Sequence, residues 1–147
     1  MISDENDKKI KRLTKKFDRV LVDAPCTGTG TWRRDPDTRA KYSDLDLENM
    51  MSLQDRILAS AARLTKPGGC LVYVTCSLLR EENEDRIIAL LSRRKDYKIV
   101  PIPKIWDEQV TVKGGGECPT NSEMLRLTPK EHKTDGFFAV VLRRDLD

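Results

Sequence analysis

The stretch "FDRVLVDAPCTGTG", Phe17 to Gly30, decides the fold because a short apolar run ends abruptly in an acid, a proline, a thiol and glycines. Residues Arg19 to Asp23 have the length and apolar character of a buried strand, and Pro25, Gly28 and Gly30 are turn residues that end it. A strand that only filled a core would not need a carboxylate and a thiol at its end. We therefore expect this strand end to carry chemistry.

The residues that follow alternate between helix and strand patterns. After a loop at 33–42, Ser43 is expected to cap a helix whose apolar residues recur every three or four positions up to Leu64 and which "KPGG" (66–69) stops. A second buried strand is expected from Cys70 to Thr75, a second helix within 80–97 and a third strand at 98–102. This alternation predicts an α/β fold with a parallel sheet.

The two ends of the chain give weaker patterns. Residues 1–16 are highly charged and are expected to form a tail or a poorly anchored helix. The segment after residue 102 is expected to be long and irregular, and residues 135–144 to form a turn and a fourth strand. The sequence contains no internal repeats.

Two of the four cysteines stand just past the predicted strands. Ligands of such sheets bind beyond the carboxyl ends of the strands. If the two strands are adjacent, about 4.8 Å apart, then Cys26 and Cys76 reach one crevice together with Asp23. Cys76 could instead be a small buried residue near a strand end. Cys70 is expected to open its strand and to be structural, and Cys118 to be incidental.

Composition limits the possible functions. The four cysteines lack CxxC spacing and the chain has a single histidine, His132, so a structural zinc site is not expected. The net charge is +3, with basic residues in short clusters that suit either a solvated face or an anionic partner. No apolar run approaches the roughly 20 residues of a membrane span, and the start lacks the apolar region of a signal peptide. These features predict a cytoplasmic protein that does not enter a membrane.

Common catalytic motifs are missing from the sequence. "GTGTWR" begins like a dinucleotide-binding GxGxxG, but Arg33 replaces the third glycine, and no phosphate loop or GxSxG elbow occurs. An acid and two thiols remain. A thiolate is a good nucleophile toward carbon, and C6 of a pyrimidine is a suitable electrophile, since attack there makes C5 nucleophilic. Trp32 could stack on a base or anchor its loop.

These residues carry a resemblance to a known family. "DAPCTGTG", followed after a helix by "KPGGCLVYVTCSLLREENE" and then by "DGFFAVVLRR", resembles the Sun/Fmu family of RNA cytosine-5 methyltransferases, which use S-adenosylmethionine. The resemblance extends over residues 17–144. It implies that Cys76 is the nucleophile that bonds to C6 and that Cys26 promotes product release. It also implies that Asp23 touches the cofactor and assists at the base, and that Pro25 shapes the cofactor loop. The implied substrate is ribosomal RNA.

The resemblance also defines the expected domain content. Family members carry a glycine-rich cofactor loop and further acidic strand ends, which do not occur before Phe17 here. Residues 17–147 therefore resemble the carboxyl-terminal half of a Rossmann-like catalytic domain. We expect this chain alone to bind S-adenosylmethionine poorly, to be inactive, and to self-associate through an exposed sheet edge. A non-catalytic RNA-binding remnant and a dithiol redox protein that uses Cys26 and Cys76 are the alternatives.

Overall fold

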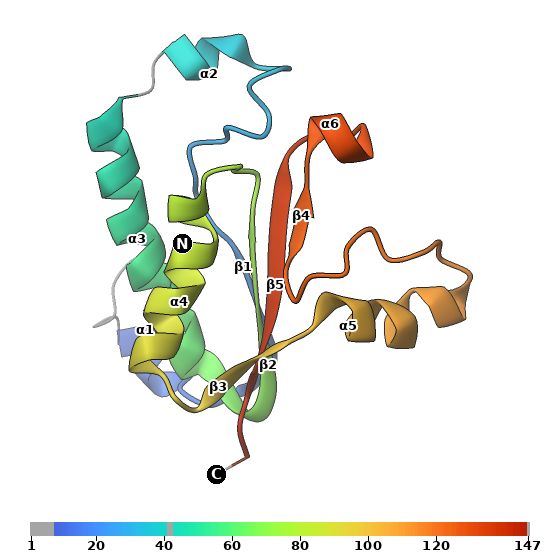
Figure 1. Cartoon of the computed structure of the whole chain (residues 1–147). Coiled ribbons are helices and arrows are strands. Elements are labelled where there is room, and N and C mark those ends of the chain that lie inside the picture. The colour runs from blue at the N-terminus through green and yellow to red at the C-terminus, as the bar shows by residue number, and fades with distance from the viewer. Residues whose placement is uncertain (1–7, 41–42, 147) are drawn as a thin grey trace.

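A computed structural model describes residues 8–40 and 43–146, which form a mixed sheet with helices on both faces (Figure 1). The five-stranded sheet has the order β1 (Phe17–Asp23), β2 (Thr65–Thr75), β5 (Phe137–Arg144), β3 (Tyr97–Val100), with β4 (Leu125–Leu127) also paired to β5. β1 runs parallel to β2, whereas β5 is antiparallel to β2, β3 and β4. The predicted α/β fold is confirmed. The parallel arrangement holds for β1, β2 and β3, and the last strand inserts antiparallel between β2 and β3.

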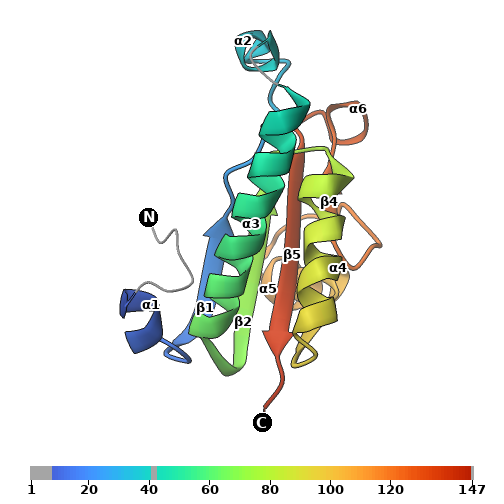
Figure 2. The same cartoon turned by 90° about the vertical axis from the view of Figure 1, so that its left-hand side faces the viewer.

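Two long helices cover one face of the sheet. Figures 1 and 2 show α3 (Asp44–Leu64) and α4 (Glu84–Arg93) on one side and α5 (Ile102–Gln109) on the other. The predicted cap of α3 is confirmed: Ser43 Oγ accepts from the Asp46 backbone, and the Asp46 carboxylate accepts from the Ser43 backbone. Reciprocal bonds of this kind satisfy amides that the first helical turn leaves unpaired.

The segment after residue 102 is irregular only in its middle, where residues 114–124 form neither helix nor strand. On either side of this stretch the expectation is wrong, because the segment also contains α5, the 3-10 turn η2 (Thr111–Lys113), β4 and α6 (Pro129–His132). Pro101 caps α5 and Pro103 stands in its first turn, where proline is tolerated. The predicted loop at 33–42 likewise contains α2 (Pro36–Ala40), and the second helix is preceded by a 3-10 turn, η1 (Arg80–Glu82). Such short elements leave little periodicity in a sequence.

The strand β2 begins earlier than predicted. α3 does end at Leu64, but "KPGG" belongs to β2, which starts at Thr65. Phe17 pairs with Thr65 and Arg19 with Cys70, so residues 66–69 bulge out of the register. Cys70 therefore lies within its strand and does not open it. The pairing register shifts across this bulge and is regular from Arg19 to Asp23.

The core lies between the sheet and the α3–α4 layer. Buried apolar side chains from the strands meet those from the two helices, and the Tyr73 and Phe138 rings pack edge to face with centroids 6.4 Å apart. α1 (Lys8–Arg12) is anchored, because Ile10 is fully buried and the backbone that follows it hydrogen-bonds to the end of α3. The rest of the predicted tail, residues 1–7, lies outside the described part of the chain.

The strand β1 lies at the edge of the sheet (Figure 2). Leu21, in its middle, is 68% exposed. Unpaired edges with apolar side chains favour pairing with another chain. Self-association through β1 stays a prediction. Among the helices of the described residues, none is long and apolar enough to cross a membrane.

Candidate functional site

Two thiols meet at the carboxyl ends of β1 and β2, the upper end of the sheet in Figure 1. Asp23 pairs with Val74, and the Ala24 amide donates to the Val74 carbonyl at 3.0 Å, so the pairing continues past the end of β1. This register places Cys26 Sγ 3.4 Å from Cys76 Sγ. The expectation that the two thiols would lie side by side is confirmed.

The two thiols have opposite acidities. The hydrogen bond between the two sulfurs lowers the pKa of Cys76 to about 7 and raises the pKa of Cys26. Cys26 is therefore the donor when Cys76 is ionised. Partial burial and the nearby carboxylates of Asp23 and Glu82 act in the other direction on Cys76. The hydrogen bond outweighs them, because it acts on the sulfur directly. Near neutral pH, about half of Cys76 is therefore a thiolate, while Cys26 stays a neutral thiol.

A buried carboxylate holds the loop that carries Cys26. Glu82, in η1, is fully buried and accepts from the Thr27 amide at 2.9 Å and the Thr27 hydroxyl at 2.5 Å. The Gln54 amide, from α3, donates to Glu82 at 3.0 Å and to the Pro25 carbonyl at 2.9 Å. The residues on both sides of Cys26 are thus fixed to α3 and to the segment after β2.

A second network fixes the backbone after Cys76. The Thr75 hydroxyl donates to the Asn83 side chain at 2.6 Å and accepts from the Ser77 amide at 3.1 Å. The Asn83 side chain donates in turn to the Ser77 carbonyl at 2.9 Å. Thr29 joins this segment to the first loop, since its hydroxyl accepts from the Leu78 amide at 2.8 Å. Both thiols are therefore preorganised rather than carried on free loops.

A close backbone approach holds the last strand against the site. The Gly30 amide donates to the Cys76 carbonyl, and the Gly136 amide donates to the Gly30 carbonyl, both at 2.9 Å. A β-carbon at Gly30 would lie 2.5 Å from the Gly136 oxygen, so only glycine fits there. The turn before β5 is in this way part of the site.

The predicted cofactor residues line a separate hollow. Asp23 and Pro25 face a cavity of about 240 Å³ between β1 and α3, whose other walls are mainly apolar. Neither Cys26 nor Cys76 lines this cavity. Asp23 is exposed at the end of its strand. The expectation that Asp23 would share one crevice with Cys26 and Cys76 is therefore wrong, because the acid lines a neighbouring hollow beside β1.

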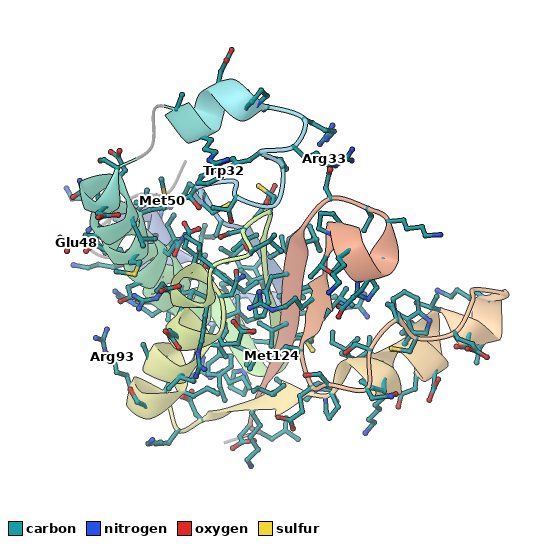
Figure 3. All side chains as sticks on the ribbon, turned by 45° about the horizontal axis from the view of Figure 1, so that its top comes forward. Trp32, Arg33, Glu48, Met50, Arg93 and Met124 are labelled. Carbon is teal, nitrogen blue, oxygen red and sulfur yellow. The ribbon has the colours of Figure 1, made fainter. Side chains whose placement is uncertain are left out.

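The remaining candidates stabilise loops. Trp32 donates from its indole to the Thr27 carbonyl at 3.2 Å, which supports the loop-anchor interpretation, and Figure 3 shows it in the loop before α2. His132 accepts from the Thr128 amide at 3.1 Å, and Cys118 donates to the Thr120 carbonyl at 3.1 Å. Within residues 8–40 and 43–146, no group of three or more His, Cys, Asp or Glu side chains could hold a metal ion.

Sequence reasoning missed the residues that position the thiols. Glu82 stands in a run of acids at the start of the predicted second helix, where the helix dipole favours negative charge, and nothing in that run distinguishes it. Gln54 did carry a signal, because it is a polar residue in the apolar row of α3. A polar side chain on a core-facing position needs a buried partner, and Glu82 is that partner.

Comparison with known proteins decides the family. The model of the family "16S rRNA methyltransferase RsmB/F" matches residues 1–143. The chain belongs to this family. A relative from Shewanella oneidensis, named ribosomal RNA small subunit methyltransferase B, is 38% identical over 123 residues, which cover 84% of this chain and 26% of the relative. The chain spans about a quarter of the length of the curated relatives it matches.

Solved structures show the same fold. A methyltransferase homolog from Pyrococcus horikoshii is 35% identical with a TM-score of 0.68, covering 92% of this chain and 41% of that one. The structure of NSun6 from the same organism, solved with SFG, is 29% identical with a TM-score of 0.69, covering 95% and 33% of the two chains. The Rossmann-like methyltransferase fold expected from the sequence is confirmed.

Proposed function

We propose that this chain supplies the thiol pair of an S-adenosylmethionine-dependent methyltransferase that methylates C5 of cytosine in ribosomal RNA. The observation that carries the proposal is the 3.4 Å contact between Cys26 and Cys76, with a lowered pKa at Cys76, in a chain of the RsmB/F family. The relatives are named as methyltransferases of small-subunit ribosomal RNA, which supports the substrate class.

Cys76 is the nucleophile of the proposed reaction. Its thiolate forms a bond to C6 of the cytosine, and the C5–C6 double bond shifts its electrons toward C5 and the ring. After C5 has received a methyl group, it loses its proton to a base, and the electrons of that C–H bond expel the Cys76 thiolate. The reaction consumes this thiolate in the attack and regenerates it in the release. A group that stabilises the thiolate therefore raises the ionised fraction before attack and makes the sulfur a better leaving group.

Cys26 is that group. In the proposed reaction, its S–H donates to Cys76 Sγ, 3.4 Å away, and stabilises the departing thiolate, so loss of Cys26 is expected to slow release most. The networks through Glu82 and Asn83 keep the two sulfurs in place. This preorganisation avoids the entropic cost of assembling the pair in each cycle.

The hollow beside β1 fits part of a methyl donor. S-adenosylmethionine supplies an electrophilic methyl group. The similar structure of NSun6 was solved with SFG, an analogue of S-adenosylmethionine. The Asp23 carboxylate could bind a polar portion of the donor, and the wall beside Pro25 could bind an apolar portion. At about 240 Å³, this cavity is smaller than the ~300 Å³ at which ligand pockets of drug-sized molecules begin. We therefore assign only part of the donor's contacts to these residues.

Trapping on a fluorinated RNA tests the proposal. The complete gene product is incubated with S-adenosylmethionine and small-subunit ribosomal RNA in which 5-fluorocytosine replaces cytosine. Because fluorine cannot leave C5 as a proton does, we expect a protein–RNA complex that survives denaturing electrophoresis. Cys76→Ala should abolish it, whereas Cys26→Ala should form a complex even on unmodified RNA. Cys70→Ala, a half-buried thiol away from the pair, is the control. A complex that persists in Cys76→Ala would refute the assignment.

A further inference from the structure

The thiol pair has the features of a peroxide-sensitive dithiol. All four cysteines are free, and Cys26 and Cys76 are both partly exposed, with their sulfurs 3.4 Å apart. A disulfide bond is about 2.05 Å long, so closure requires the sulfurs to approach by about 1.4 Å. They already lie within hydrogen-bond distance, and Gly28 beside Cys76 carries no side chain; even an added β-carbon there would stay 4.0 Å from Cys76 Sγ.

We propose that hydroperoxides oxidise Cys26 and Cys76 to a reversible disulfide, which makes this pair an oxidation site that blocks its own nucleophile. The inference goes beyond the proposed methyl transfer. Disulfide formation does not depend on RNA or on a methyl donor, so the two proposals can fail separately. Only the consequence, a loss of methyl transfer in the oxidised protein, rests on the proposed function.

The acidities assign an order to the two thiols. Peroxide reacts with thiolates, and sensor cysteines combine a low pKa, exposure and a nearby second thiol. Cys76, with its pKa lowered to about 7 by the hydrogen bond from Cys26, is the sulfur that attacks. The pKa of Cys26 is raised by the same contact, so Cys26 stays protonated until Cys76 has reacted. It then acts as the resolving thiol.

The reaction balances with peroxide as the only oxidant. The Cys76 thiolate attacks one peroxide oxygen, the O–O bond breaks, and hydroxide leaves and becomes water by taking up a proton. Cys26 loses its proton and attacks the Cys76 sulfenic sulfur. The S–S bond forms as the S–O bond breaks, and a second water leaves. Two thiols and one peroxide give one disulfide and two waters, with two electrons passing from sulfur to oxygen.

The other two cysteines serve as internal controls. Cys70 is paired within β2 opposite Arg143 of β5, and Cys118 donates to the Thr120 carbonyl. All four thiols are partly exposed, so exposure alone would not single out Cys26 and Cys76. A selective reaction of Cys26 and Cys76 therefore reports their mutual contact.

The experiment treats the reduced 147-residue chain with hydrogen peroxide at pH 7, alkylates the remaining thiols and measures the intact mass. We expect two of the four thiols to disappear with the loss of two hydrogen atoms. Peptide mapping should link Cys26 to Cys76, and dithiothreitol should restore both thiols. A variant that combines Cys70→Ser and Cys118→Ser should give the same crosslink at the same rate.

Single substitutions distinguish a disulfide pair from two independent thiols. In Cys26→Ala, the pKa of Cys76 should rise toward 9, and the rate of its oxidation at pH 7 should fall by about tenfold or more, since the thiolate fraction falls with it. The product should then be an oxygen adduct of Cys76 that forms no crosslink. In Cys76→Ala, Cys26 should stay a free thiol. Oxygen addition to Cys76 without a crosslink in the unsubstituted chain, or a crosslink that involves Cys70 or Cys118, would overturn the proposal.

Discussion

Removal of the Glu82 carboxylate should destabilise the loop that carries Cys26. In Glu82→Ala, the Thr27 amide and one Gln54 amide proton lose their acceptor, and both residues are buried. A buried donor left without a partner costs about 1 to 3 kcal/mol. The Thr27 hydroxyl can rotate, so it is not counted. We therefore expect a loss of roughly 2 to 6 kcal/mol, a large part of the 5 to 15 kcal/mol that typically stabilises a domain.

Two further variants make this prediction specific. Glu82→Gln keeps an oxygen for both amide donors and offers an N–H to the Thr27 hydroxyl, which can accept it. Its cost should be about 1 kcal/mol, since charged hydrogen bonds become neutral ones. Glu81→Ala removes an exposed carboxylate of the same 3-10 turn and should change the stability by no more than about 0.5 kcal/mol.

Urea denaturation followed by circular dichroism gives the three free energies of unfolding. The rate of Cys76 alkylation at pH 7 in the folded protein gives an independent measure of the position of the pair. We expect the order Glu81→Ala, Glu82→Gln, Glu82→Ala in increasing destabilisation. Equal stabilities for Glu82→Ala and Glu81→Ala would refute the role of the buried carboxylate.

Three more substitutions test other parts of the structure. Gly30→Ala would bring a β-carbon to 2.5 Å from the Gly136 backbone oxygen, so we expect it to destabilise the fold by at least the roughly 1 to 3 kcal/mol of overpacking. Gly116→Ala is the control, because a β-carbon there would meet nothing within 4 Å, and its midpoint of thermal denaturation should stay close to that of the unsubstituted chain. Ser43→Ala removes the cap of α3 and should cost about 1 kcal/mol in urea, and an unchanged midpoint would contradict the capping role. The hydrogen bond from Arg94 lowers the pKa of Asp96 from 3.8 to about 2. The Asp96 carboxylate therefore stabilises the folded state fully above pH 3.8, and this contribution is lost as the pH falls through about 2. Asp96→Asn should therefore flatten the dependence of stability on pH in that range, and an unchanged acid profile would contradict the ion pair.

The sequence was sufficient for the elements whose signals are local. The apolar runs at β1 and β2, the cap at Ser43 and the three- and four-residue spacing of α3 each depend on residues close together in the chain. The meeting of Cys26 and Cys76 followed from them, because parallel neighbours bring their carboxyl ends to one edge of the sheet. The family resemblance rested on the same residues.

Tertiary structure decided what depends on distant partners. The insertion of β5 between β2 and β3 and the pairing of β4 with β5 are choices among strands that leave no local trace. In the sequence, Glu82 is one acid among several. It supports the loop of Cys26 only because it is buried against Gln54 and Thr27, which lie 28 and 55 positions away in the chain. The pKa of Cys76 has the same origin. The chain supplies a thiol with an ordinary acidity. A hydrogen bond with a cysteine 50 residues away in the chain lowers the pKa of this thiol to about 7, because the bond stabilises the charged form more than the neutral form.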